Sequence, residues 1–168
     1  TIALNEALRE VLNPPTSHKT QISRFGKLFR DGDKVMQTRN NYDLDVFNGD
    51  IGRILRLNEG SHTALVDFGG REVEYGLDQI DQLEAAYAIT CHKSQGSEFP
   101  AVLLPLFSGQ YMMLRRNLVY TAFTRAKQVL VVLGEQRALQ TAISRVDSGT
   151  RFGRLSERLN NAIGLTSS

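Results

Sequence analysis

Two stretches of the chain decide its fold: AITCHKSQGSEFP at residues 88–100 and YTAFTRAK at residues 120–127. The first is a polar run with a glycine in its second half, and short apolar runs flank it at residues 87–90 and 102–106. Such runs have the length and composition of strands. We therefore predict a polar loop between two strands at the edge of a sheet.

The second stretch belongs to a predicted helix followed by a strand. Apolar residues recur at helical spacing and predict a helix over residues 115–126, with Leu114, Leu118 and Ala122 on one face. Residues 128–133 then form a buried strand that Gly134 closes. In open α/β sheets, ligands bind in loops at the carboxyl ends of strands. The polar loop is therefore a candidate site.

The residue types in the loop suit a ligand that carries phosphate and sugar. Gly96 lets a backbone approach closely, while His92 and Lys93 can donate to phosphate. Further hydroxyl and amide groups come from Thr90, Ser94, Gln95 and Ser97. Arg125, at the predicted helix end, carries a planar fork that suits a polyphosphate. Two simpler interpretations stay open: an ordinary surface turn and a solvated helix-terminal charge.

Composition excludes little. The chain has 168 residues, 41% of them hydrophobic and 23% charged, which is typical of a folded domain or two small ones. With 20 Lys and Arg against 18 Asp and Glu, the net charge is only +2. Any attraction for nucleic acid must therefore come from local clusters, the candidates being Arg115, Arg116, Arg125 and Lys127.

The single cysteine, Cys91, excludes an internal disulfide, and the three histidines show no metal-ligand spacing. A thiol nucleophile built from Cys91 and His92 is a further interpretation, although no third orienting group is evident. No long apolar run or signal peptide is present, so we expect no membrane contact and a cytoplasmic location. An apolar stripe over residues 4–12 predicts a helix from almost the first residue, and without an initiator Met we expect sequence upstream.

Between that helix and the polar loop, short strands alternate with tight turns. Residues 32–39 form an alternating strand, residues 40–43 a loop and Asn48-Gly49-Asp50 a turn. Three further strands follow at residues 51–57, 63–68 and 72–75. We predict a small antiparallel meander with one buried face.

The quoted stretches resemble the fifth and sixth motifs of superfamily 1 nucleic-acid helicases, closest to the RecD-like branch. The segment FGKLFRDGDKVMQTRNNY at residues 25–42, followed by VFNGDIG at 46–52, is similar to the part of these helicases that leads into an SH3-like barrel. The resemblance implies an α/β fold: a RecA-like second motor domain with an inserted SH3-like β-barrel. It implies four parts, at residues 1–30 (motor domain), 31–84 (SH3-like insertion), 85–160 (remaining motor domain) and 161–168 (frayed tail).

The resemblance also implies roles for individual residues. Arg125 would be the catalytic arginine that meets the γ-phosphate. Three loop residues would lie at the nucleotide, with Glu98 near the ribose: Gln95, Gly96 and Glu98. The UvrD-like branch has Lys in place of Gln95. Six residues would face single-stranded DNA: Thr90, His92, Lys93, Asn41, Tyr42 and Asn48.

A phosphate-binding loop is missing from the sequence. Such a loop needs Gly-x-x-x-x-Gly-Lys followed by Ser or Thr, but Gly26-Lys27 is preceded by Gln21 at the first position and followed by Leu28. No apolar strand ends in an Asp-Glu pair that could hold magnesium. We therefore expect ATP and Mg²⁺ to bind in an intact enzyme, with Mg²⁺ held by residues outside this chain.

The function that the resemblance implies is that of the C-terminal part of an ATP-dependent DNA helicase, of the exodeoxyribonuclease V alpha type. Its expected partners are single-stranded DNA, an upstream RecA-like domain of the same protein and other subunits of a helicase–nuclease complex. The chain alone is expected to be inactive. Two alternatives stay open: a stand-alone nucleic-acid-binding module, and an SH3-like domain that docks a protein partner.

Overall fold

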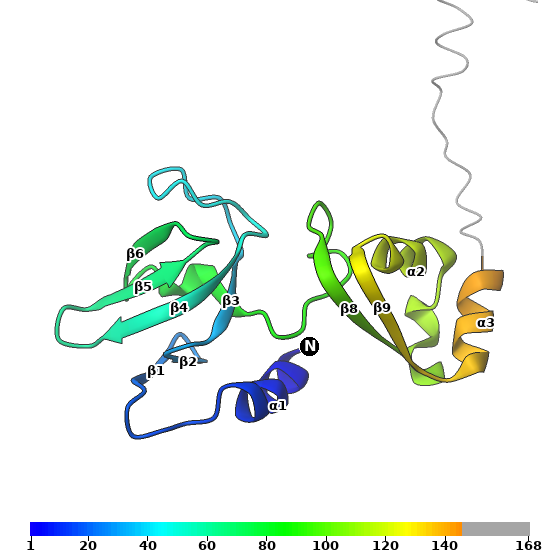
Figure 1. The fold of residues 1–168 in the computed structure, drawn as a ribbon, viewed down its shortest axis with the longest axis horizontal. Helices are drawn as coiled ribbons and strands as arrows, with labels where there is room; N and C mark the ends of the chain where they lie inside the picture. The colour runs from blue at the N-terminus through cyan, green and yellow to red at the C-terminus, as the bar shows by residue number, and fades with distance from the viewer. Residues whose placement is uncertain (146–168) are drawn as a thin grey trace, which may run out of the picture.

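A computed structural model describes residues 1–145 of the chain as two lobes joined by an irregular linker (Figure 1). The first lobe contains α1 and seven strands, and the second contains β8, β9, α2 and α3. The linker, residues 86–98, carries the polar loop. The predicted tail at residues 161–168 and the end of the predicted motor domain lie outside the described residues.

The first lobe begins with α1 (Ile2–Leu12) and a hairpin of β1 (Gln21–Arg24) and β2 (Lys27–Arg30). Five further strands form one antiparallel sheet in the order β6-β5-β4-β3-β7: β3 (Lys34–Gln37), β4 (Ile51–Asn58), β5 (Thr63–Asp67), β6 (Glu72–Gly76) and β7 (Leu83–Ala85). A short 3₁₀ helix, η1 (Ile80–Gln82), precedes β7. The predicted antiparallel meander is therefore confirmed.

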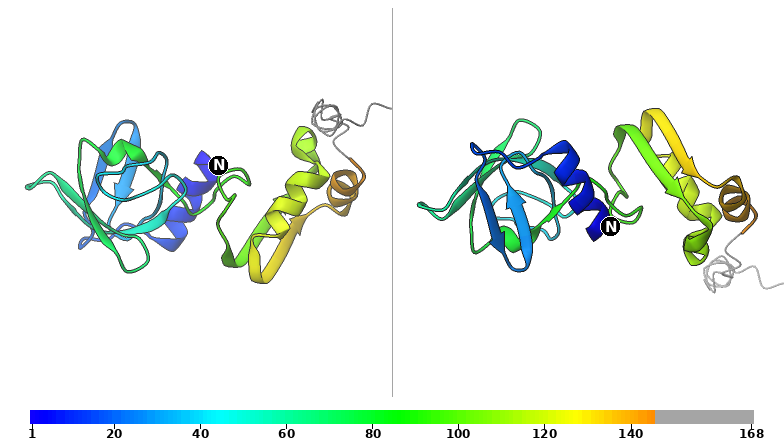
Figure 2. Two further views of the ribbon diagram at one scale, coloured as in Figure 1. Left: turned by 90° about the horizontal axis from the view of Figure 1, so that it is seen from above. Right: turned by 90° about the horizontal axis from the view of Figure 1, so that it is seen from below.

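One core holds this lobe together. Ile54, Val66 and Tyr75 are fully buried on the sheet, and Ile22 and Phe29 of the hairpin join the same cluster. One face of the sheet is buried, as predicted, because Ala64 and Val66 of β5 are buried while Leu65 and Asp67 are half-buried. The sheet is not closed into a barrel, although it is of SH3-like size and curls around the core (Figure 2).

Helix α1 packs on the lobe through its polar side. Asn5 and Arg9 are buried, whereas Val11 and Leu12 are 77% and 65% exposed. The reason is Asp33, a fully buried carboxylate whose Oδ2 lies 3.0 Å from Arg9 Nε. The N–H of Arg9 does not point along this contact, so the contact is an ion pair rather than a hydrogen bond. A buried charge needs such a partner, and this need outweighs the apolar stripe.

The second lobe is a two-stranded parallel sheet with helices on one side. It comprises β8 (Phe99–Leu106), the 3₁₀ segment η2 (Ser108–Met113), α2 (Arg116–Phe123), β9 (Ala126–Gly134) and α3 (Gln136–Ser144). Its core is formed by Leu106, Leu114, Val119, Ala138 and Ala142.

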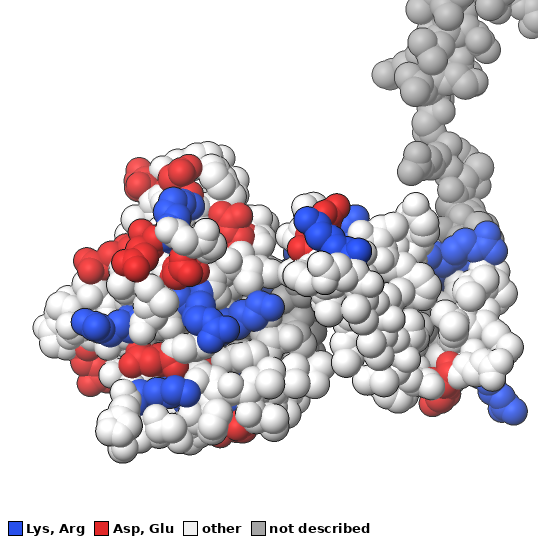
Figure 3. All heavy atoms as spheres, viewed as in Figure 1, with Lys and Arg blue, Asp and Glu red and all other residues white. Residues whose placement is uncertain are grey.

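The prediction that residues 128–133 are buried is wrong for this chain. Leu103 of β8 pairs with Val131 of β9, and the two are 62% and 41% exposed. They belong to the sheet face opposite the helices, together with Val129 and Leu133. Figure 3 shows much of this lobe without charged side chains in that view. The strand has the composition of a doubly covered strand, but within residues 1–145 only one face is covered.

Two further predictions need correction. Residues 87–90 are not a strand, because the backbone N–H and C=O of Ala88 pair with the side-chain amide of Asn5 instead of a neighbouring strand. The predicted helix over 115–126 is shorter, since α2 ends at Phe123 and Arg125 lies in the turn between α2 and β9.

The α/β fold class with an SH3-like insertion is confirmed. None of the helices among residues 1–145 is long and apolar enough to cross a bilayer.

Candidate nucleotide and nucleic-acid site

The polar loop is a run of tight turns held by its own backbone. Ser94 N donates to Thr90 O at 3.1 Å, and Ser97 N donates to Ser94 O at 3.1 Å. Ser94 is buried, and its hydroxyl donates to Cys91 O at 2.8 Å. With Ser94 turned inward, the predicted ligand-facing residues of the loop are left exposed: Thr90, His92, Lys93, Gln95, Gly96 and Glu98.

Gly96 is the point where a ligand can approach the backbone. Its φ is +85°, in the left-handed region that favours glycine. Beyond its chain neighbours, no atom of residues 1–145 lies within 4 Å of the position that a Cβ would take. The glycine is therefore required by conformation and leaves open space above the peptide.

Arg125 lies directly against the end of this loop. Its Nη1 donates to Ser97 O at 3.0 Å, and its Nη2 donates to Thr124 Oγ1 at 3.2 Å. The backbone is joined as well, because Phe99 N donates to Arg125 O at 2.8 Å. The structure thus brings the predicted arginine and the predicted loop into one site, although they are 28 residues apart from Ser97 to Arg125.

Two charged residues of the loop, Lys93 and Glu98, each form an ion pair. Glu98 Oε2 lies 3.1 Å from Lys127 Nζ, and both side chains are more than half exposed. Lys93 Nζ pairs with Glu84 Oε2 of β7. Exposed pairs of this kind are worth about 0–1 kcal/mol, so a bound ligand can exchange them.

Cys91 is no activated nucleophile. Burial raises the pKa of its thiol above the usual value, so the thiol stays protonated at neutral pH. Its hydroxyl neighbour Ser94 donates to the Cys91 carbonyl rather than to the sulfur. Within the part of the chain that the structure describes, no group of three or more His, Cys, Asp or Glu residues could hold a metal ion.

The other predicted DNA-facing residues lie elsewhere, in the loop between β3 and β4 on the first lobe. Asn41 is committed to that loop: its Nδ2 donates to Gln82 Oε1 at 3.1 Å, and its Oδ1 accepts from Leu44 N at 3.1 Å. Tyr42 is 75% exposed and meets Phe47 edge to face, with 6.1 Å between ring centroids. Asn48 is exposed too, and its backbone N–H donates to Asn40 Oδ1 at 3.0 Å.

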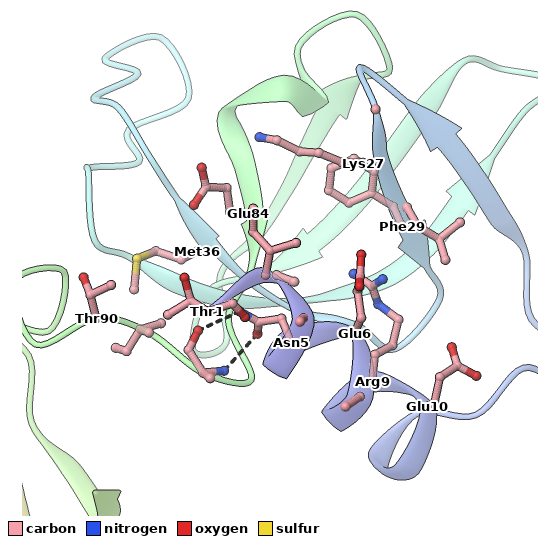
Figure 4. Close-up of a pocket in the computed structure, with 18 of the residues that line it drawn as sticks. Thr1, Asn5, Glu6, Arg9, Glu10, Lys27, Phe29, Met36, Glu84 and Thr90 are labelled. Carbon is pink, nitrogen blue, oxygen red and sulfur yellow. Dashed lines mark hydrogen bonds between the residues drawn. The ribbon is translucent and has the colours of Figure 1, made fainter. Parts of the chain in front are cut away.

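Three contacts of the site were missed by sequence reasoning: the pairing of Asn5 with Ala88, that of Glu84 with Lys93, and the acceptor role of Ser97 O. The first pins the linker two residues before Thr90, with distances of 2.8 and 2.9 Å for its two hydrogen bonds. Figure 4 shows Asn5 on the side of α1 that faces this linker. A polar residue, Asn5, within the predicted helix over residues 4–12 was the only signal in the sequence.

Charge is mixed over the molecule. In the view of Figure 3, Lys and Arg side chains alternate with Asp and Glu over the first lobe and do not form one basic stripe. Attraction for a polyanion would therefore depend on individual cations of the site.

Comparison with known proteins matches both lobes. The family described as "ATP-dependent RecD-like DNA helicase SH3 domain" matches residues 4–68, and the family described as "UvrD-like helicase C-terminal domain" matches residues 85–133. Among curated relatives, the ATP-dependent RecD2 DNA helicase of Deinococcus radiodurans is 43% identical over 116 residues, or 69% of this chain and 16% of the relative. The RecBCD enzyme subunit RecD of Haemophilus influenzae is 39% identical over 130 residues, covering 77% and 19%.

The chain thus spans less than a fifth of the length of these two relatives. Among solved structures, Pif1 helicase from Bacteroides in complex with ADP-AlF3 and ssDNA is similar with a TM-score of 0.59. The similarity covers 98% of this chain and 44% of that one, at 17% identity. At that identity the likeness concerns the fold.

Proposed function

We propose, from the premise that the chain belongs to the RecD-like superfamily 1 helicases, that it is the C-terminal part of an ATP-dependent DNA helicase. In this proposal it completes an ATP site whose other half lies on an upstream RecA-like domain of the same protein. It also binds single-stranded DNA during translocation and unwinding. The likeness to a RecBCD enzyme subunit supports assembly with further subunits.

The observation that carries the proposal is the hydrogen-bonded path from the loop to the arginine. Thr90, Ser94 and Ser97 are linked in succession by backbone hydrogen bonds, and Ser97 O accepts from the Arg125 guanidinium. The residues proposed to face single-stranded DNA and the arginine proposed to face the γ-phosphate of ATP are therefore joined by one continuous hydrogen-bonded path. A displacement at either end changes the geometry at the other.

The residues present fit half of a nucleotide site. Open space over Gly96 allows phosphate or ribose to approach the backbone, and Gln95 and Glu98 are exposed on either side of it. When bound, ATP would supply the phosphoryl group and Mg²⁺ would neutralise charge on its oxygens. The Mg²⁺ would be held by residues outside this chain, and Arg125 would supply the cationic fork from this side.

Arg125 has two tasks in this proposal. Its Nη1–H bond to Ser97 O holds the side chain half-buried beside the loop. On domain closure, the same fork would donate to the oxygens on which charge develops in the transition state. Closure and loop geometry are therefore linked through one guanidinium group.

The test is Arg125→Ala in the helicase polypeptide that contains this chain. We expect ATP turnover to fall by about a thousandfold or more, as for other arginine fingers, while ATP binding falls much less. Arg125→Lys keeps the charge but loses the planar fork, so we expect only partial recovery. Turnover near the wild-type rate in Arg125→Ala would refute the proposed role.

A further inference from the structure

The lysine that the proposed function assigns to the DNA backbone forms an ion pair with a carboxylate in the structure. Lys93 lies in the first turn of the polar loop, where its backbone N–H donates to Thr90 Oγ1 at 3.3 Å. Its Nζ pairs with Glu84 Oε2 from the β7 edge of the sheet. The side chains are 45% and 43% exposed, so solvent and solutes reach both groups.

The pair lies on a groove of about 880 Å³ between α1, the β1–β2 hairpin and the linker. Figure 4 shows Glu84 and Thr90 on this groove, with Lys27 and Arg9 further along its wall. Three cationic side chains line it: Arg9, Lys27 and Lys93.

Each of these cations already has an anionic or carbonyl partner, but the three sets of partners differ in how easily they are replaced. Arg9 pairs with Asp33, and the two side chains are only 7% and 1% exposed. Lys27 Nζ donates to the main-chain carbonyls of Asp81 and Leu83, both at 2.9 Å. Breaking the first contact leaves a buried charge unpaired, and breaking the second costs two charge-assisted hydrogen bonds.

The pair of Lys93 with Glu84 is the exchangeable one. Both groups are half in water, so separating them costs only about 0–1 kcal/mol. A phosphate oxygen can take the position of the carboxylate oxygen on Nζ, because both are anionic acceptors of similar geometry. Glu84 then returns to solvent without a buried charge being left behind.

We propose that Glu84 is an internal competitor of the DNA backbone for Lys93. In the absence of DNA, the Glu84 carboxylate neutralises Lys93. When single-stranded DNA binds, one of its phosphates replaces the carboxylate. The inference rests on the proposed strand-binding function and adds a residue that limits affinity. In this proposal Glu84 does not contact the DNA strand, and its carboxylate lowers the affinity of the chain for single-stranded DNA.

The exchange also has a consequence for salt dependence. A free lysine that neutralises a phosphate of a single strand releases a counterion and adds about 0.7 to the slope of log K against log salt. In the wild-type chain the freed Glu84 carboxylate takes up a cation from solution, which offsets that release. Removing Glu84 should therefore steepen the salt dependence by up to about one charge.

The experiment measures binding of a fluorescent oligo-dT strand by the full chain at several salt concentrations. We expect Glu84→Gln to bind about two- to fivefold more tightly at low salt, with a steeper slope, since exposed pairs are worth up to about 1 kcal/mol. Glu6→Gln is the matched control: Glu6 lines the same groove and, within residues 1–145, makes no ion pair. The third variant is Glu84→Gln combined with Lys93→Ala, in which the gain should disappear.

Two outcomes overturn the inference while leaving the proposed function intact: an equal gain in Glu6→Gln and Glu84→Gln, which shows diffuse charge repulsion, or a gain that survives Lys93→Ala. Unchanged binding in Glu84→Gln also overturns it. Absence of binding by both the wild-type chain and Glu84→Gln would refute the inference together with the strand-binding function. Circular dichroism of each variant checks that Glu84 and Glu6 substitutions leave the fold unchanged.

Discussion

Lys93 and Glu98 lie five residues apart on one exposed loop, yet the proposed function assigns them to different ligands. Ser94, buried between them, anchors the loop to its own backbone. Before this anchor, Lys93 pairs with Glu84 of β7, and after it, Glu98 pairs with Lys127 of β9. Single substitutions should therefore separate the two functions.

A first prediction at the residue scale concerns that separation in the helicase polypeptide. Replacing His92 and Lys93 by Ala should weaken single-strand affinity and DNA stimulation of ATP hydrolysis. In a Glu84→Gln background, where no freed carboxylate offsets the counterion release, it should also lower the salt dependence by up to about one charge for Lys93. Basal ATP hydrolysis should survive. Glu98→Ala should instead raise the apparent KM for ATP and leave strand affinity without nucleotide unchanged. The same response from both variants, or none from either, would contradict the assignment.

A second prediction at this scale concerns alkaline stability. Burial, with a contribution from Asp50, raises the pKa of Tyr75 to about 12, and its hydroxyl donates to Gln37 Oε1 at 3.1 Å. Because the pKa is higher in the folded than in the unfolded state, the stabilisation is fully present below pH about 10 and is lost as the pH rises through about 12. The expected loss is about 2–3 kcal/mol.

Urea unfolding at pH about 8 and about 11.5 checks this window. Tyr75→Phe should lower stability at pH 8, because Gln37 loses its partner, but should show a smaller loss on going to high pH. Some loss should remain, since burial and the hydrogen bond to Asp33 also raise the pKa of Tyr87. An equal alkaline loss in the wild type and in Tyr75→Phe would show that another group titrates.

At the scale of elements, Asp33 joins α1, the hairpin and the linker. Its Oδ1 accepts from Asn13 Nδ2 at 2.8 Å and from the Tyr87 hydroxyl at 2.9 Å. Its Oδ2 accepts from Arg30 N at 3.0 Å and pairs with Arg9. One fully buried carboxylate thus holds three segments that are remote in sequence.

We therefore predict that Asp33→Ala destabilises the chain by about 3–5 kcal/mol, because Arg9 is left buried and unpaired. Asp43→Ala is the control, since Asp43 is exposed on the loop between β3 and β4 and its change should stay within about 0.5 kcal/mol. Urea midpoints of the two variants compare them directly. Similar midpoints would show that α1 is not held through this network.

A second prediction at this scale concerns the clamp between α1 and the linker. Asn5→Ala removes both hydrogen bonds to Ala88, at 2.8 and 2.9 Å, and frees the backbone that leads into Thr90. We expect faster amide exchange at Ala88 and weaker strand binding, with the exchange rates of β4 and β5 unchanged. Uniformly faster exchange throughout the first lobe would mean that Asn5 stabilises the fold and has no local effect on the loop.

At the scale of the whole molecule, the linker with its polar loop runs from β7 of the first lobe to β8 of the second (Figure 1). One end of that loop is tied to α1 through Ala88, and the other to β9 through Phe99 and Arg125. The segment between Ile89 and Glu98 therefore lies between two anchored ends. In the proposed helicase, the ligand-facing residues of the loop lie between these two anchors.

The prediction at this scale is that the isolated chain shows no ATP hydrolysis above background, with or without single-stranded DNA. The proposal places the phosphate cradle and the magnesium ligands outside it. Steady-state turnover of the purified chain, compared with an Arg125→Ala preparation to detect a contaminating ATPase, measures this. Turnover that Arg125→Ala abolishes would contradict the half-site proposal.

Sequence alone determined those features that depend on local patterns. Alternating residues and turn signals predicted β3 to β6, and helical spacing predicted α1 and α2, because these periods follow directly from backbone geometry. The loop around Gly96 and the arginine after α2 were recognisable because their chemistry and order are both written in consecutive residues. Their assignment to the nucleotide and the strand remains a proposal.

Only the tertiary structure decided which face of each element is buried and which side chains meet. The apolar stripe of α1 turned outward because Asp33, buried 24 residues beyond Arg9, needs a cation. The backbone at Ala88 is not part of a β-strand because its N–H and C=O are hydrogen-bonded to the side-chain amide of Asn5, 83 residues away. Lys93 pairs with Glu84 of the edge strand β7, nine residues earlier in the chain. The first two pairings span 24 and 83 residues and the third spans nine, and one-dimensional periodicity carries no information on such polar partners.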